Sequence, residues 1–288
     1  MSSHTYQQWA HRSFIDRSRT AERGISLVEL MVAVAVGLFV ILIATTIYME
    51  GLRNFNFRTS QSENLGNSRY ALGALDNEFT KAGFRRDPTQ AMNQAFPADE
   101  AAHPNGCQFA VGQAMYAVNA STLCIRYQAR DNNEKDCAGS AAGIAGLKAY
   151  EAPPAPALGA GMFVEKYFLS GETLACQAGS QAGENKQEVA VGVRGVHFEF
   201  GVGKGSDSFA ERRVEQFKTD TPGGEDVIRS LRYAVLLASA TERVTGGIDS
   251  SVCSRWTAAG GAVARCDTSK GQLYQLASGS LTLRNLMP

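Results

Sequence analysis

The sequence predicts an α+β protein in which a long N-terminal helix, half transmembrane and half amphipathic, packs on an antiparallel β-sheet head. Three patterns support this prediction. An apolar segment runs from Ile25 to Met49, an amphipathic segment follows it, and strand-like runs divided by glycine-rich turns make up the rest. We divide the 288 residues into a leader (1–24), an apolar helix (25–49), its amphipathic continuation (50–86) and a globular head (87–288).

The overall composition is that of a folded protein. Apolar residues make up 44% of the chain and charged residues 19%, which is too apolar for a disordered segment of this length. The formal net charge is zero, and removal of residues 1–24 leaves 24 basic and 26 acidic side chains. This balance does not favour a nucleic acid as a partner.

The leader differs from a conventional secretory signal. Four arginines precede Gly24, and the apolar segment begins only after this glycine. A conventional signal carries its apolar stretch before the cut, so that the stretch is removed. Cleavage between Gly24 and Ile25 would instead leave the hydrophobic helix on the mature chain. The alternative is an uncleaved signal anchor whose basic side stays in the cytoplasm.

The apolar segment is long enough to cross a bilayer. Leu30 to Met49 comprises 20 residues, interrupted only by one glycine, two threonines and a tyrosine. At about 1.5 Å per residue, a helix of this length matches the roughly 30 Å hydrocarbon core. The basic residues upstream place the N-terminus in the cytoplasm and the head in the periplasm. We therefore expect a single-pass protein in contact with inner-membrane lipid.

Glu29 is the acidic residue at the start of this apolar helix. A carboxylate at membrane depth is costly unless it has a partner. In one interpretation Glu29 lies at the cytoplasmic headgroups. In the other, its carboxylate pairs with the new amine at Ile25 of a neighbouring subunit and sets the axial register between subunits, because an unpaired buried charge costs several kcal/mol.

Helical periodicity continues beyond the apolar segment and then stops. Gly83 and Pro88 are stop signals, so one helix is expected from about Ile25 to about Ala82. Apolar residues recur at helical spacing along one face: Leu65, Leu72, Leu75, Phe79 and Ala82.

The sequence of the head predicts mainly β-strands. The predicted strands are Cys107–Val118, Leu123–Gln128, Phe163–Leu169, Thr173–Cys176, Glu188–Gly201, Leu231–Ser239 and Leu273–Leu283. Together they favour an antiparallel sheet packed on the second half of the helix.

All six cysteines follow the apolar segment, as expected for a head in an oxidising compartment. Cys253 and Cys266 enclose a Gly/Ala-rich loop far from the others, so we expect them to pair. The spacing leaves the other pairings open, and nearest neighbours would give Cys107–Cys124 and Cys137–Cys176. The chain has no Cys-x2-Cys pair, and only His103 and His197 follow the leader, so no metal ligand spacing is present.

Enzyme motifs are also missing from the sequence. It contains no Gly-x-Ser-x-Gly elbow and no His-Glu-x-x-His pair, and Gly201–Gly205 lacks the spacing of a phosphate-binding loop. His197 lies in a strand-like run and is interpreted as structural. We therefore expect no catalytic residues and no cofactor.

Several segments resemble type IV pilins. The string Arg-Gly-Ile-Ser-Leu-Val-Glu at residues 23–29 and the helix after it resemble the class III signal peptides of type IV pilins and type II secretion pseudopilins. Four further segments resemble W-type minor pilins and J-type minor pseudopilins: 69–84, 188–202, 231–239 and 281–285. Many major pilins carry a proline at the position of Thr46, so their helix kink cannot be transferred to this chain.

The resemblance implies a function. A prepilin peptidase would cleave between Gly24 and Ile25 and methylate the Ile25 amine. The subunit would then prime type IV pilus assembly and enter the pilus tip at the cell surface. Implied partners are the peptidase, other minor pilins, the major pilin, the inner-membrane assembly platform and a tip adhesin. The alternatives are a minor pseudopilin of a type II secretion system and a signal-anchored periplasmic enzyme or binding protein.

Overall fold

The computed structural model describes residues 24–141, 143–144, 146–153, 161–205, 213–220, 222–223, 226–246 and 251–286. Of the predicted leader, residues 1–23 lie outside this range. The chain divides into two compact units, Met1–Leu52 and Arg53–Pro288. Helix α1 (Leu27–Thr80) begins in the first unit and ends in the second. We consider each unit by itself.

In the first unit, α1 presents apolar side chains without protein cover. Every residue from 24 to 52 is solvent-exposed, and this stretch includes the long apolar run. The hydroxyls of Thr45 and Thr46 donate to carbonyls one turn back, Ile41 and Ile43, at 2.9 and 2.7 Å. Both threonines thus satisfy their polar groups within the helix. Among the described residues, α1 is long and apolar enough to cross a membrane.

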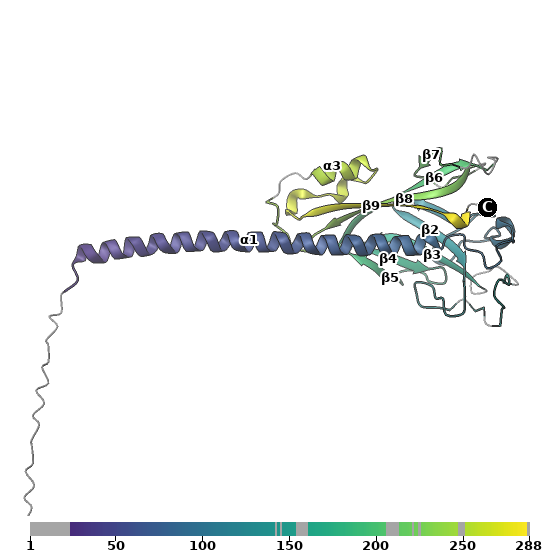
Figure 1. Ribbon diagram of the computed structural model, residues 1–288, viewed down its shortest axis with the longest axis horizontal. Helices are drawn as coiled ribbons and strands as arrows, with labels where there is room; N and C mark the ends of the chain where they lie inside the picture. Colours follow the sequence, from purple (N-terminus) through teal and green to yellow (C-terminus); the bar gives the residue numbers. More distant parts are fainter. Residues whose placement is uncertain are drawn as a thin grey trace, which may run out of the picture. The chain divides into compact units, whose positions relative to one another are not determined.

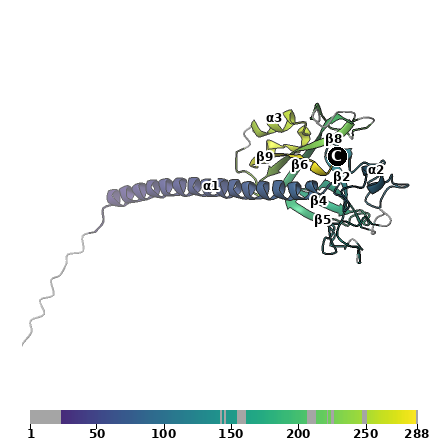
Figure 2. The same ribbon diagram turned by 45° about the vertical axis from the view of Figure 1, so that its right-hand side comes forward.

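The second unit contains two antiparallel sheets rather than the single sheet that the sequence predicts (Figure 1). The first sheet is a meander in the order β1-β2-β3-β4-β5, and the second has the order β7-β6-β8-β9. Figure 2 labels strands of both sheets, among them β4 and β5 of the first and β8 and β9 of the second. The strands are β1 (Met115–Asn119), β2 (Thr122–Gln128), β3 (Met162–Ser170), β4 (Thr173–Ala178), β5 (Gln187–Val191), β6 (Val193–Lys204), β7 (Gln216–Lys218), β8 (Asp226–Ala238) and β9 (Tyr274–Thr282). The short helices are α2 (Met92–Ala95), α3 (Ser251–Ala258) and the 3-10 turns Val263–Arg265, Thr268–Lys270 and Arg284–Leu286.

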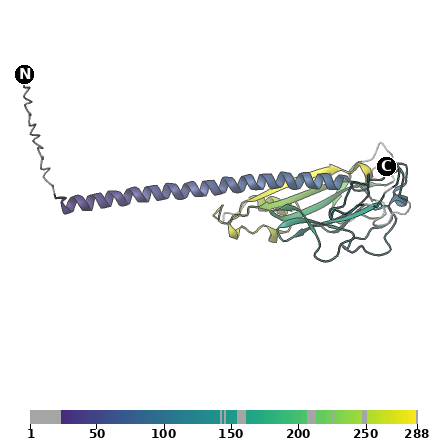
Figure 3. The same ribbon diagram turned by 90° about the horizontal axis from the view of Figure 1, so that it is seen from below.

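The second half of α1 runs alongside the strands and shares one core with both sheets (Figure 3). Phe79 is fully buried in this core. Its ring makes edge-to-face contacts with Tyr167 of β3, at 5.2 Å between centroids, and with Phe198 of β6, at 5.6 Å. A third contact joins it to Tyr233 of β8, at 5.9 Å. One side chain of α1 therefore contacts both sheets.

The buried face of α1 differs in part from the predicted stripe. Leu75, Phe79 and Ala82 lie in the core as expected, but Leu65 is 42% exposed. The observed stripe continues toward the N-terminus through Ser60, Asn64, Ser68 and Ala71. Its first three residues are polar, and Asn64 Nδ2 donates to the carbonyl of Leu273 at 2.7 Å. Apolar periodicity could not predict that this face is buried, because its polar side chains Asn64 and Ser68 are held by hydrogen bonds to residues around the start of β9.

Gly83 and Asn285 together terminate α1. Gly83 has φ +71°, a left-handed conformation that favours glycine, and its N–H donates to the carbonyl of Arg126 at 3.0 Å. Asn285, near the end of the chain, donates from Nδ2 to the carbonyls of Thr80 and Ala82 at 2.8 and 3.3 Å. Carbonyls of the last turn that lack helical partners are satisfied in this way.

The predicted strand Glu188–Gly201 is wrong as a single element. It forms β5 and β6, which belong to different sheets. The break is Gly192, which has φ +73° and accepts a hydrogen bond from the N–H of Ala238 at 3.0 Å. The chain crosses between the sheets at this residue because glycine alone adopts the left-handed conformation at low cost.

The predicted strand Cys107–Val118 is wrong over its first half, where the chain forms a loop. The cause is Arg126 of β2, whose side chain is only 2% exposed. Its guanidinium donates to four carbonyls, those of Phe96, Pro97, Ala110 and Gln113. It also lies over the ring of Phe109 at 4.7 Å. A buried cation requires such a set of acceptors, and the loop supplies them.

The region between Cys253 and Cys266, predicted as a loop, contains most of helix α3, which begins at Ser251. Trp256 on this helix is 1% exposed and packs with Ala234, Leu236 and Tyr274 of β8 and β9. Its indole N–H donates to the carbonyl of Ala262 at 2.9 Å. Trp256 holds the short helix on the second sheet, which periodicity over eight residues could not reveal.

Replacement of Phe79 by alanine should destabilise the head strongly. The substitution removes a fully buried ring and its three aromatic contacts, and such changes cost about 3–5 kcal/mol. Chemical denaturation of the full chain in detergent measures the change. Tyr70→Ala is the control, because Tyr70 lies on the same helix but is 66% exposed. A loss of less than about 1 kcal/mol for Phe79→Ala would contradict the core described above.

Candidate processing and assembly site

Gly24 and Ile25 lie in the non-helical segment immediately before α1. Gly24 is exposed, with open space where a Cβ atom would be placed, and Ile25 is 74% exposed. The peptide bond between them therefore precedes the first helical residue and is not covered by the described residues. A peptidase requires such an accessible, non-helical bond, since helical backbone groups are already hydrogen-bonded.

Ser26 starts the helix. Its Oγ accepts a hydrogen bond from the N–H of Glu29 at 3.3 Å, and its carbonyl accepts one from the N–H of Leu30 at 3.1 Å. Ser26 is thus the N-cap residue, and Glu29 lies three residues after it. Ser26 is not among the site residues predicted from the sequence, although the Ser-x-x-Glu spacing before an apolar run is a recognisable start signal.

Glu29 is placed in the first helical turn and is solvent-exposed. A carboxylate here interacts favourably with the positive end of the helix dipole. Within the described part of the chain, no cation lies within ion-pair distance of this carboxylate. Glu29 therefore remains available to an external cation, while its backbone N–H serves the cap.

The N-terminal region matches a known motif. Residues 19–45 match the family described as the prokaryotic N-terminal methylation motif, a range that includes Gly24, Ile25 and Glu29. No curated protein gives a significant sequence match to this chain. The motif marks a class III signal peptide, and it indicates a pilin-like or pseudopilin-like substrate of a prepilin peptidase. Proteins of this kind are structural subunits. The match covers the N-terminal region alone.

The cysteines of the head form three disulfides: Cys107–Cys124, Cys137–Cys176 and Cys253–Cys266. These are the nearest-neighbour pairs. The first connects the loop before β1 to β2, the second connects a loop to β4, and the third connects α3 to the residue after the turn Val263–Arg265. All three lie within the second unit.

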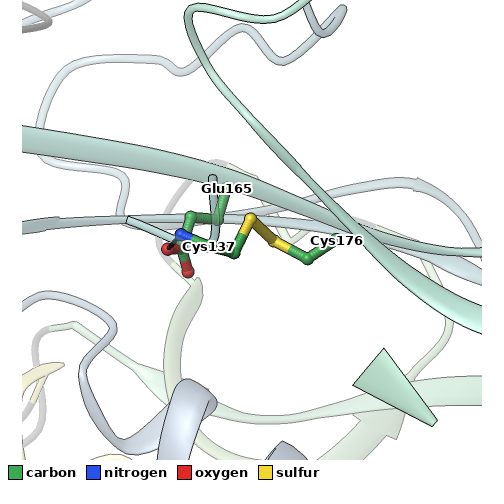
Figure 4. Close-up of side chains that lie close together, drawn as sticks. All are labelled: Cys137, Glu165 and Cys176. Carbon is green, nitrogen blue, oxygen red and sulfur yellow. Dashed lines mark hydrogen bonds between the residues drawn. A yellow bond between two sulfur atoms is a disulfide. The ribbon is translucent and has the colours of Figure 1, made fainter. Parts of the chain in front are cut away.

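One of these disulfides lies next to a buried acid. Ligand atoms of Cys137, Cys176 and Glu165 lie within 4.8 Å of one another (Figure 4). Such a trio resembles an incomplete metal site, but the two sulfurs are bonded to each other and are not free to act as thiolate ligands.

Glu165 of β3 is fully buried and accepts several hydrogen bonds. The N–H of Cys137 and the hydroxyl of Tyr127 donate to Oε1 at 2.9 and 3.2 Å. The hydroxyl of Tyr167 lies 2.7 Å from Oε2. Burial is the main cause that raises the pKa of Glu165 to about 7, opposed by the Tyr167 and Cys137 hydrogen bonds.

The raised pKa predicts a pH-dependent stability. Because the pKa of Glu165 is about 7 in the folded head and its ordinary value is 4.5, the folded head binds this proton more tightly than the unfolded chain does. The free energy of unfolding therefore falls as pH rises from about 4.5 to 7 and is constant above that range. Glu165→Gln removes this titration. Between pH 4.5 and 8, its stability relative to wild type should increase by about 3 kcal/mol.

Denaturant titrations at several pH values measure this change. Glu184→Gln serves as control because the Glu184 side chain is 97% exposed, and it should follow the wild type at every pH. A difference between Glu165→Gln and wild type that does not vary with pH would show that the acid is ionised in the folded head.

Proposed function

We propose that this chain is a W-type minor pilin that primes type IV pilus assembly and enters the pilus tip. The observation that carries the proposal is the methylation motif over residues 19–45. The exposed peptide bond after Gly24 and the exposed apolar helix after it support the same pathway. The end of the amphipathic helix, at 69–84, resembles this subclass, and so do the segments 188–202, 231–239 and 281–285 of the head.

The proposed pathway begins in the inner membrane. The apolar part of α1 anchors the precursor with its head in the periplasm, and a prepilin peptidase cleaves between Gly24 and Ile25 and methylates the new amine. Apolar side chains exposed over this length need lipid or other apolar helices around them. The helix therefore exchanges lipid for neighbouring helices when the subunit joins other minor pilins and the major pilin on the assembly platform.

Glu29 supplies the register in this proposal. Its carboxylate pairs with the Ile25 amine of a neighbouring subunit once both are removed from water. Separation of such a pair leaves both the carboxylate and the amine without a partner, which costs several kcal/mol. A subunit displaced along the filament axis would lose this pair, so the correct position is favoured over neighbouring ones.

Replacement of Glu29 by glutamine should separate anchoring from assembly. Glutamine keeps the size and the backbone hydrogen bond to Ser26 but removes the charge. The variant should remain in the membrane, since the apolar segment is unchanged, and should fall at least about tenfold in sheared surface filaments. Quantitative immunoblots of both fractions measure this. Glu50→Gln, an exposed acid farther along α1, should behave as wild type. Equal incorporation of both variants would refute the register role.

Deletion of the gene that encodes this chain distinguishes a role in a pilus from a role in a secretion system. A minor pilin that primes assembly is needed in small numbers for every filament, so its loss should reduce the number of surface pili and leave type II secretion unchanged. Electron microscopy of surface filaments and assays of secreted proteins measure the two effects, with a complemented strain as control. Normal piliation with a secretion defect would favour the J-type pseudopilin instead.

A further inference from the structure

The three disulfides of the head differ in how far each cysteine is covered. Cys107 and Cys124 are both fully buried, and Cys253 and Cys266 are both partly exposed. The pair Cys137–Cys176 is asymmetric, because Cys137 is half-buried whereas Cys176 is fully buried. Thiol–disulfide exchange requires direct access of the attacking thiolate to a sulfur atom. For this pair, access favours Cys137.

The same pair has an acid beside it. Glu165 lies within 4.8 Å of both sulfurs, and its Oε1 accepts the N–H of Cys137 (Figure 4). In the described part of the chain, neither of the other disulfides has an acidic or histidine ligand atom this close to both of its sulfurs. A buried thiolate is unfavourable in apolar surroundings. To react, the buried Cys176 must therefore lose its thiol proton when the bond forms and regain one when the bond is reduced. Glu165 is close enough to accept and to donate this proton.

The surroundings of Glu165 keep a proton nearby. The hydroxyl of Tyr167 lies between Glu165 Oε2 and Glu78 Oε2, at 2.7 and 3.0 Å. A hydroxyl has one proton, so it can donate to only one of the two carboxylates at a time. Lys81 Nζ lies 2.6 Å from Glu78 Oε2. Burial raises the pKa of Glu165 to about 7, so this carboxyl group is present both with and without its proton near neutral pH.

The two buried tyrosines beside Glu165 stay neutral. Tyr127 donates to Oε1 and is buried, and burial raises its pKa, so it remains a neutral donor. Burial likewise raises the pKa of Tyr167 well above its ordinary value. A general acid or base works best when its pKa is near the operating pH, and that of Glu165 is about 7.

We infer that Cys137 is the sulfur at which a dithiol–disulfide oxidoreductase forms and breaks the Cys137–Cys176 bond, with Glu165 as the proton acceptor and donor for Cys176. This inference does not depend on whether the chain enters a filament.

Formation of the bond transfers two electrons to the oxidoreductase. The Cys137 thiolate attacks the disulfide of the oxidoreductase, which yields a mixed disulfide and one thiolate of the enzyme. The Cys176 thiol then gives its proton to the Glu165 carboxylate and attacks the Cys137 sulfur. The Cys137–Cys176 bond forms as the mixed disulfide breaks, and the enzyme leaves reduced by two electrons, with two thiolates that take protons from water. In reduction, Glu165 returns the proton to the sulfur of Cys176 as it leaves.

Glutathione tests the site of attack on the wild-type full chain in detergent. Brief treatment, acid quench and peptide mass spectrometry locate the mixed disulfide. The inference predicts glutathione on Cys137 and free thiol on Cys176. Glutathione on Cys176, or equal amounts on both, would overturn it.

Dithiothreitol tests the role of Glu165. The rate of reduction of Cys137–Cys176 is divided by that of Cys253–Cys266 in the same sample, which cancels the ionisation of the reagent. This ratio should fall in wild type as pH rises through about 7, and in Glu165→Gln it should be about tenfold lower at pH 6 and independent of pH. Glu184→Gln should match wild type.

A merely structural role of Glu165 gives the opposite result. If Glu165→Gln loosens the head, the Cys137–Cys176 bond becomes more accessible and its relative rate increases. A rate ratio in Glu165→Gln that equals or exceeds the wild-type ratio at pH 6 would overturn the inference. So would a wild-type ratio that does not vary between pH 6 and 8.

Discussion

The contact of Phe79 with three aromatic rings is the interaction on which the head depends. Its ring meets Tyr167 of one sheet and Phe198 and Tyr233 of the other. The residues beside it add polar contacts, because Glu78 lies 3.0 Å from the Tyr167 hydroxyl and Asp76 accepts the hydroxyl of Tyr233. A single turn of α1 therefore fixes the helix to both sheets. Displacement of the helix by one turn would remove all of these contacts together.

This arrangement also explains the placement of the remaining polar groups. The tyrosines extend from the aromatic core toward charged groups on α1, so each buried hydroxyl finds an acceptor. Glu165 lies at the end of this network, next to the Cys137–Cys176 bond. A carboxyl group in that place is costly when ionised and useful as a proton reservoir. Stability and disulfide chemistry therefore depend on the same side chain.

Sequence patterns predict the features that depend on local physics. The apolar run and the stop at Gly83 follow from hydropathy and backbone preference, and most strands follow from alternation. The wrong predictions involve distant partners. Arg126 keeps residues before β1 in a loop by donating hydrogen bonds to four carbonyls. Gly192, with its left-handed backbone, divides one predicted strand into two strands of different sheets. The face of α1 around Asn64 is buried through hydrogen bonds that no hydrophobic pattern records.

The intact mass of the protein from membranes, with and without the prepilin peptidase, tests the central claim most directly. The account predicts loss of residues 1–24 and gain of one methyl group on Ile25, only when the peptidase is present. Such a result would show that the motif over residues 19–45 is cleaved and methylated in this chain. A leader that stays intact in both samples would contradict the account, and Glu29 would then be an interfacial acid on an uncleaved signal anchor.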